Sequence, residues 1–179
     1  RVNKEHWPGS QFKRSISRIN SEYQFPSLEG DSDIFSYNQS YLLASENQWN
    51  PRPVFQSYAA FNKYLIENNL AHYRSAQAPD NIFFRIEPID GRLPSLDDGA
   101  LWPLLLNQYS IDQTITDYLV LKRNGAIKNQ DGYLKNIGSL ESTFGTPIEI
   151  PDTGKIIYMT AKFYPTALGI IKSILFKEN

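Results

Sequence analysis

The chain of 179 residues contains no cysteine. Disulfide bonds, thiolate nucleophiles, iron–sulfur clusters and zinc sites of the cysteine type are therefore excluded. It contains only two histidines, His6 and His72, which do not form the His-x-x-x-His pair of a zinc site on a helix. Asp90, Asp97 and Asp98 lack the alternating spacing of a calcium-binding loop. We expect no metal site.

Long apolar runs and an excess of one charge are also missing. The longest apolar stretch, residues 167–176, is interrupted by Lys172 and is shorter than the roughly 18 residues of a membrane-spanning helix. The formal net charge is −1, whereas proteins that bind the phosphate backbone of nucleic acids gather lysine and arginine on one face. We expect neither a membrane span within these residues nor a nucleic-acid partner.

Sequence motifs of common active sites are absent as well. The chain has no Gly-x-Ser-x-Gly elbow of a serine hydrolase and neither of the glycine-rich patterns that hold ATP or dinucleotide phosphates. No cofactor is therefore predicted.

What is present indicates a folded domain, since hydrophobic residues make up 41% of the chain and charged residues 21%. Helical spacing of apolar residues predicts helices over 11–23 and 57–73, the second with Tyr58, Phe61, Tyr64 and Leu65 as its buried stripe. A further helix is either kinked at Pro103 or begins near Leu101. Short apolar runs predict strands over 34–37, 54–56, 81–86 and 118–122.

This alternation of strands and helices predicts an α/β fold, a small Rossmann-like mixed sheet with helices on its faces. A turn at 131–132 and strands at 146–150 and 155–162 predict a C-terminal antiparallel β appendage, while 166–176 fits either a helix or a strand. We expect a single domain over 1–179, made of a helical lead-in (1–30), an α/β core (31–123) and the β-rich appendage (124–179).

Two acidic residues stand at the predicted end of the strand 81–86. Glu87 and Asp90 flank the point where open α/β sheets bind ligands. Two carboxylates across a cleft can act as acid and base, for example in glycoside hydrolysis. They are the catalytic candidates, and the alternative is that they form turns and caps, as residues of these types often do.

A second set of candidates is Arg52, Gln56, Arg92 and Trp102. Arg52 stands between two prolines that restrict its backbone, and Arg92 lies in the turn after the strand. Guanidinium groups and an indole suit a carbohydrate or an anionic small molecule as ligand. The alternative is an arginine–aspartate brace, in which Arg92 pairs with a neighbouring aspartate and stabilises the turn.

Three stretches resemble a known group of proteins. RPVFQSY at 52–58, APD at 78–80 and IDGRLP at 89–94 are similar to a soluble segment of an uncharacterised family of bacterial polytopic membrane proteins. The similarity covers roughly residues 31–123. It implies an extracytoplasmic location, periplasmic or on the cell surface, with attachment to the membrane through other parts of a parent chain. The start at Arg1 and the end after an apolar run agree with chain boundaries cut from something larger.

Three functions stay open at this point. The first is a non-catalytic accessory or recognition domain of a bacterial envelope membrane protein. The second is an envelope enzyme, a transferase or hydrolase of glycans or lipid-linked sugars, with its site near the turn at 89–92. The third is a free-standing secreted interaction protein.

Overall fold

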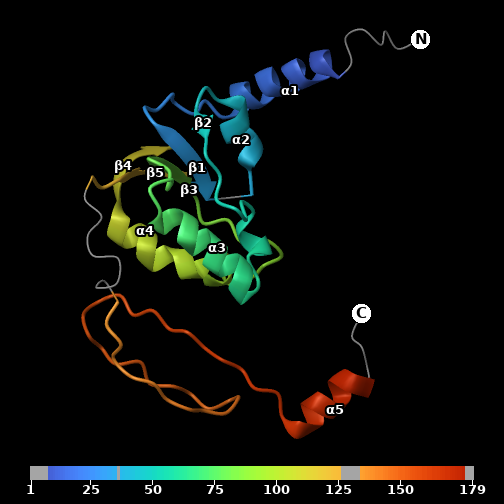
Figure 1. Ribbon diagram of the computed structural model, residues 1–179, viewed down its shortest axis with the longest axis vertical. Coiled ribbons are helices and arrows are strands. Elements are labelled where there is room, and N and C mark those ends of the chain that lie inside the picture. Colours follow the sequence, from blue (N-terminus) through green and yellow to red (C-terminus); the bar gives the residue numbers. More distant parts are fainter. Residues whose placement is uncertain (1–7, 36, 126–133, 176–179) are drawn as a thin grey trace. The chain divides into compact units, whose positions relative to one another are not determined.

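The computed structural model describes residues 8–35, 37–125 and 134–175, which belong to two compact units, Arg1–Asn136 and Ile137–Asn179. The first unit contains the sheet and most helices (Figure 1). Its elements are α1 (Gly9–Glu22), β1 (Asp31–Phe35), α2 (Gln39–Ala44), β2 (Gln48–Trp49), α3 (Lys63–Arg74), β3 (Asn81–Phe84), α4 (Trp102–Gln108), β4 (Tyr109–Ile115) and β5 (Tyr118–Arg123). Short 3₁₀ turns lie at Ser57–Ala59, Pro94–Leu96 and Gly99–Leu101.

The five strands form one mixed sheet in the order β2-β1-β3-β5-β4. β1 is parallel to both β2 and β3, and the register places Phe35 opposite Phe84 at the carboxyl ends of β1 and β3. β5 is antiparallel to both β3 and β4. The predicted α/β fold with a mixed sheet is therefore confirmed.

Apolar side chains cover both faces of the sheet, because successive residues of a strand point to opposite sides. Ile82 packs in the cluster that α3 and α4 complete, and Phe83 packs in the cluster on the other face, together with Leu42 of α2. The near-continuous apolar run of β3 is thus explained by burial on two sides.

The strand predicted at 54–56 does not form, and β2 lies earlier in the chain. The amide of Asn50 donates to the carbonyl of Ser32 at 2.8 Å, just beyond the last paired residue of β2. Pro51 and Pro53 follow directly, and neither has an N–H to continue the ladder. The prolines thus end β2, and 52–56 is a loop.

The helix predicted from residue 57 begins later, at Lys63. The Oδ1 of Asn62 accepts a hydrogen bond from the amide of Leu65, which caps α3. The predicted stripe is wrong at two positions, since Phe61 is 77% and Tyr64 is 69% exposed. Because α3 starts after the 3₁₀ turn, later residues form its core-facing side. These are the buried residues Asn69 and Tyr73 and the partly buried Leu70.

α4 begins at Trp102 with Pro103 in its first turn, as one of the two predicted alternatives has it. The strand β4 directly after it was not predicted. Most of its side chains are exposed because it is an edge strand, so its sequence carries no apolar run. A tight connection in which Thr116 has a φ of 51° joins β4 to β5.

The second unit is described by itself. It contains α5 (Ala167–Leu175), which resolves the ambiguous segment as a helix. The antiparallel strands predicted at 146–150 and 155–162 are wrong, since no strand occurs over 134–175. Pro147 removes one backbone donor from the first of these segments, and Pro151, which also lacks an N–H, follows it directly. The turn predicted at 131–132 lies outside the described residues.

Candidate functional site

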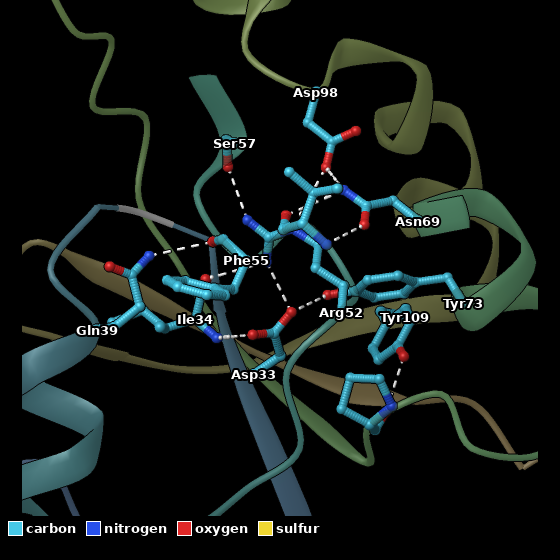
Figure 2. A network of polar contacts seen from close by, with 12 residues as sticks. Asp33, Ile34, Gln39, Arg52, Phe55, Ser57, Asn69, Tyr73, Asp98 and Tyr109 are labelled. Carbon is cyan, nitrogen blue, oxygen red and sulfur yellow. Dashed lines mark hydrogen bonds and ion pairs between the residues drawn. The ribbon is translucent and has the colours of Figure 1, made fainter. Parts of the chain in front are cut away.

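Arg52 lies at the centre of a buried network of polar side chains (Figure 2). Its Nη1 donates to Oδ2 of Asp33 at 2.6 Å and to the carbonyl of Ile34 at 3.1 Å, and its Nη2 donates to Oγ of Ser57 at 2.7 Å. The guanidinium carbon lies 4.6 Å from the centre of the Phe35 ring. Only 1% of Arg52 is exposed, so its charge does not reach the surface of this unit.

Asp98 brings a second carboxyl group to the same guanidinium. Its Oδ2 lies 3.3 Å from Nε of Arg52 and accepts a hydrogen bond from Nδ2 of Asn69 at 2.7 Å. Burial raises the pKa of Asp98 to about 6, although Arg52 and the hydrogen bond from Asn69 both act to lower it. Asp98 is therefore a group that takes up a proton only slightly below neutral pH.

The network joins three parts of the chain. Asp33 on β1 also accepts from the hydroxyl of Tyr73 on α3 at 2.8 Å. Asn69, one turn earlier on α3, accepts from the amide of Val54 at 2.8 Å and donates to its carbonyl at 3.1 Å. β1, α3 and the loop at 52–57 are thus fixed to one another by polar contacts.

The charge of Arg52 is retained within the protein interior. Burial alone would lower the pKa of Arg52, but attraction to Asp33 and Asp98 raises it above its ordinary value. Because both Nη atoms donate to groups of this chain and Nε lies within ion-pair distance of Asp98, we interpret Arg52 as a structural brace. The partners are Asp33 and Asp98, rather than the neighbours of the turn at 89–92.

A small pocket lies next to this network, at the carboxyl ends of β1 and β3. Its walls include Phe35 and Phe84, the last residues of the two strands, together with Tyr58 and Trp102. The cavity volume is about 20 Å³, and a buried water needs roughly 10–15 Å³. The pocket therefore takes a group about the size of a water molecule. This edge of the sheet is where open α/β folds bind ligands.

Two polar atoms without a partner belong to residues of this pocket. Asp97 is only 7% exposed. Its Oδ2 accepts a long hydrogen bond of 3.4 Å from the amide of Ile89, while its buried Oδ1 has no partner among the described residues. The buried indole Nε1 of Trp102 has none there either. Leaving such an atom unpaired costs about 1–3 kcal/mol, but both atoms are fully buried, so neither lies on the open surface of the pocket.

Glu87 lines the pocket too, and its carboxylate is held by neighbours. Both oxygens accept from Nδ2 of Asn38, at 3.1 and 3.0 Å, and Oε1 lies 3.4 Å from Nη2 of Arg85. The negative charge of Glu87 is also the main reason why the pKa of Tyr37 is raised. Arg85 in turn pairs with Asp117 at 2.8 Å. These contacts tie Glu87 into an ion-pair chain, which opposes its use as a general base.

The other predicted site residues lie outside the pocket lining. Asp90 and Arg92 are exposed in the turn at 89–92, and within the part of the chain that the structure describes Arg92 makes no ion pair with Asp90 or Asp97. Gln56 is half-buried ahead of the 3₁₀ turn. Of the four predicted ligand-binding residues, Trp102 alone lines the pocket, and Glu87 is the catalytic candidate that does so.

Several residues of the network and the pocket were not predicted, namely Asp33, Asn69, Tyr73 and Asp98 of the network and Tyr58 and Asp97 of the pocket. One signal was available for the network. Asp33 is a charged residue directly before the apolar pair of β1, and a buried carboxylate in a central strand requires a partner. No comparable signal marks Asn69 or Tyr73, because both read as ordinary residues of a helix.

Within the described residues, no group of three or more histidine, aspartate or glutamate side chains is placed to hold a metal ion. His72 is half-buried near the end of α3, where its ring contacts that of Tyr73 at a centroid distance of 5.7 Å. Burial lowers the pKa of His72, which favours the neutral imidazole.

Comparison with protein-family models finds no match, and neither do comparisons with curated proteins and with solved structures. Among the described residues, none of the helices has both the length and the apolar character needed to cross a bilayer. The functional argument therefore rests on the residues of the site.

Proposed function

We propose that this chain is a non-catalytic recognition domain of a bacterial envelope membrane protein, and that it binds its ligand in the pocket at the carboxyl ends of β1 and β3. The observation that carries the proposal is the chemistry of this pocket. Aromatic side chains form its walls together with the acidic residues Glu87 and Asp97, and it lies at the sheet edge where open α/β folds bind ligands.

The state of the charged groups favours binding over catalysis. A general base needs a carboxylate within reach of a substrate proton, whereas Glu87 is engaged by Asn38 and Arg85. The second catalytic candidate, Asp90, does not line the pocket. An acid–base pair across one cleft is therefore not assembled from these two residues.

The extracytoplasmic location belongs to the same proposal and is supported by the sequence resemblance over residues 31–123. It can be tested because the chain has no cysteine of its own. Ser95 is exposed in a 3₁₀ turn, so a Ser95→Cys variant offers one accessible thiol. We expect a membrane-impermeant maleimide to label it in intact cells. Labelling only after the inner membrane is disrupted would refute the location.

Binding is tested by a melting scan of the whole chain with a panel of sugars, small acids and amines. A ligand of the folded state raises the melting temperature in proportion to RT ln(1 + [L]/Kd). We expect at least one compound to do so, and Trp102→Ala to abolish the effect. Arg92→Ala, an exposed change outside the pocket, is the control and should leave it intact.

The alternative function, an envelope enzyme that acts on a glycan or a lipid-linked sugar, is separated by product analysis. Any compound that binds is incubated with the protein and with a Glu87→Gln variant, and its products are followed by mass spectrometry. Turnover that disappears in the variant would establish the enzyme and refute the non-catalytic role.

A further inference from the structure

The helix α5 is apolar, and none of its residues is buried (red in Figure 1). Its large aliphatic side chains are between 48% and 80% exposed, namely Leu168, Ile170, Ile171, Ile174 and Leu175. Single apolar residues are common on protein surfaces, but so many within one short helix form a continuous patch. Such a patch marks a surface that binds another apolar surface.

The residues of α5 are distributed unevenly around its axis. With about 100° per residue, the aliphatic side chains fall within an arc of roughly 160°. Gly169, Lys172 and Ser173 occupy the remaining arc. A helix buried in lipid on all sides is apolar all round, whereas a helix with an apolar face and a polar face lies along an interface. The pattern of α5 is of the second kind.

The residues that lead into α5 also suit an interface. Oγ1 of Thr166 accepts a hydrogen bond from the amide of Gly169 at 3.1 Å, which caps the helix. Phe163 and Tyr164, shortly before this cap, are 73% and 83% exposed. Tyrosine is enriched at the level of lipid headgroups, because its ring is apolar and its hydroxyl is polar. The apolar patch of α5 therefore continues into exposed aromatic residues.

The charges around α5 are all positive. Residues 153–175 contain Lys155, Lys162 and Lys172, which are exposed, and no aspartate or glutamate, although the whole chain has a formal net charge of −1. An apolar segment with local positive charge complements a lipid surface with anionic headgroups. A second copy of the same segment would instead bring like charges together, which opposes self-association.

We propose that α5, together with Phe163 and Tyr164, docks on the surface of a bilayer that contains anionic lipids. The aliphatic face enters the boundary between headgroups and acyl chains, and the lysines lie at the lipid phosphates. This is a membrane contact made by residues of this chain itself. It does not involve the pocket at β1 and β3, so it goes beyond the proposed recognition function and is tested separately.

The first test is sedimentation of the whole chain with vesicles at increasing lipid concentration. One set of vesicles is phosphatidylcholine, and the other contains equal amounts of phosphatidylcholine and phosphatidylglycerol. We expect binding to the mixed vesicles and at least tenfold weaker binding to the uncharged ones, because the anionic surface attracts the lysines. Salt at about 1 M should weaken binding to the mixed vesicles, since it shortens the screening length to about 3 Å.

One pair of variants assigns the apolar contribution to α5. Ile170→Asn combined with Ile174→Asn removes two aliphatic side chains without changing the charge, and should weaken binding to the mixed vesicles at least tenfold. Ile150→Asn combined with Ile156→Asn is the matched control. Both of these side chains are exposed in the same unit but lie outside α5, so binding should not change.

A second pair assigns the contribution of charge. Lys162→Gln combined with Lys172→Gln should weaken binding to the mixed vesicles and leave binding to phosphatidylcholine unchanged. Lys63→Gln combined with Lys122→Gln changes the net charge by the same amount in the other unit, at two exposed positions. This control should bind both kinds of vesicle as the unmodified chain does.

The orientation of α5 is tested with a single fluorescent label, because the chain has no cysteine of its own. Ile174→Cys places the label on the aliphatic face, and Ser173→Cys places it on the polar face. On mixed vesicles we expect the label at position 174 to shift its emission to shorter wavelength and to be protected from iodide. The label at position 173 should remain open to quenching.

Four results would overturn the proposal. The first is no binding to the mixed vesicles, and the second is binding that Ile170→Asn with Ile174→Asn does not weaken. The third is equal binding to both kinds of vesicle. The fourth is protection of the label at position 174 before vesicles are added, which would show that a second copy or another part of the chain already covers α5. None of these results concerns the pocket, so the proposed recognition function stands or falls by its own tests.

Discussion

Arg52 keeps its charge in the interior because groups of the protein replace the water that it loses. Removing an ion from water costs several kcal/mol, and the cost is recovered only if attraction and hydrogen bonds are well placed. Asp33 at 2.6 Å and Ser57 at 2.7 Å supply this replacement, and Asp98 adds a second carboxyl group. The two prolines beside Arg52 restrict the backbone that presents it.

Removal of the guanidinium should therefore be costly. Arg52→Ala leaves two buried carboxyl groups without their cation, and we expect the free energy of unfolding at pH 7 to fall by about 3–5 kcal/mol. Arg52→Lys keeps the charge without the planar fork and should cost less. Urea denaturation followed by circular dichroism measures both changes. A loss below about 1 kcal/mol in Arg52→Ala would mean that the network does not stabilise the fold.

The raised pKa of Asp98 predicts how the free energy of unfolding depends on pH. Its pKa is about 6 in the folded protein, against 3.8 ordinarily. Between these two pH values, Asp98 is protonated in the folded state and ionised in the unfolded state. Its contribution to the free energy of unfolding is therefore fully present below pH 4 and is lost as pH rises through 6. One pKa unit corresponds to about 1.4 kcal/mol, which gives a change of about 3 kcal/mol for this residue.

The Asp98→Asn variant isolates this contribution, because other titrating groups cancel in the difference between the two proteins. We expect urea denaturation at pH 4 and pH 7.5 to show that the variant gains stability relative to the unmodified chain as pH rises. A difference that does not change between these two pH values would show that Asp98 titrates normally in the fold.

Only some of the contacts of Arg52 and some of the pocket residues could be predicted from the sequence. A brace between arginine and aspartate was among the predicted alternatives, although it was assigned to Arg92 and its neighbours. The partner of Arg52 on β1 lies 19 positions away, and only the pairing of strands and helices brings such residues together. Glu87 was a candidate because it follows a strand, where open α/β sheets bind ligands, whereas Trp102 was a candidate because an indole suits the face of a saccharide.

At the level of the elements, the turn before β1 depends on Gly30. Its φ is +86°, and a Cβ built there would lie 2.8 Å from Cβ of Asp80, closer than real contacts allow. Asp80 is held in place by its amide, which donates to Oδ1 of Asp31 at 3.0 Å. The close approach of these two segments at the start of β1 and β3 thus requires glycine.

Gly30→Ala should lower the free energy of unfolding by about 2–4 kcal/mol, because positive φ and overpacking both add cost. Gly91→Ala is the matched control. Gly91 also has a positive φ, of +65°, but a Cβ there meets nothing within 4 Å. The control should cost only the backbone strain, about 1–2 kcal/mol. Equal losses in a chemical denaturation series would show that Asp80 moves away without difficulty.

The elements that the sequence predicted best are those with strong apolar patterns. β3 and β5 follow from runs that are buried in the sheet, and α4 follows from apolar residues with a proline in the first turn. β4 was not predicted from the sequence, because an exposed edge strand needs no apolar pattern. The start of α3 was misplaced because Asn62 and Ser57 are both good caps, and the hydroxyl of Ser57 is engaged by Arg52.

At the scale of the unit Arg1–Asn136, the network and the pocket are connected. Ser57 and Phe35 contact Arg52 and also line the pocket, and Asp97 and Asp98 are adjacent in the chain. The brace therefore fixes parts of the pocket wall and the residue next to Asp97. A rigid pocket reduces the ordering cost of binding, which is how a structural arginine supports recognition without touching a ligand.

The two units should differ sharply in hydrogen exchange. β3 is paired on both sides, by β1 and β5, so its amides should exchange slowest, close to the rate of global unfolding. Residues 146–165 have no strand or helix and most of their side chains are exposed, so their amides should exchange within seconds. Mass spectrometry after short labelling times measures both. Strong protection at 146–150 and 155–162 would show that the antiparallel strands expected from their sequence do pair in solution.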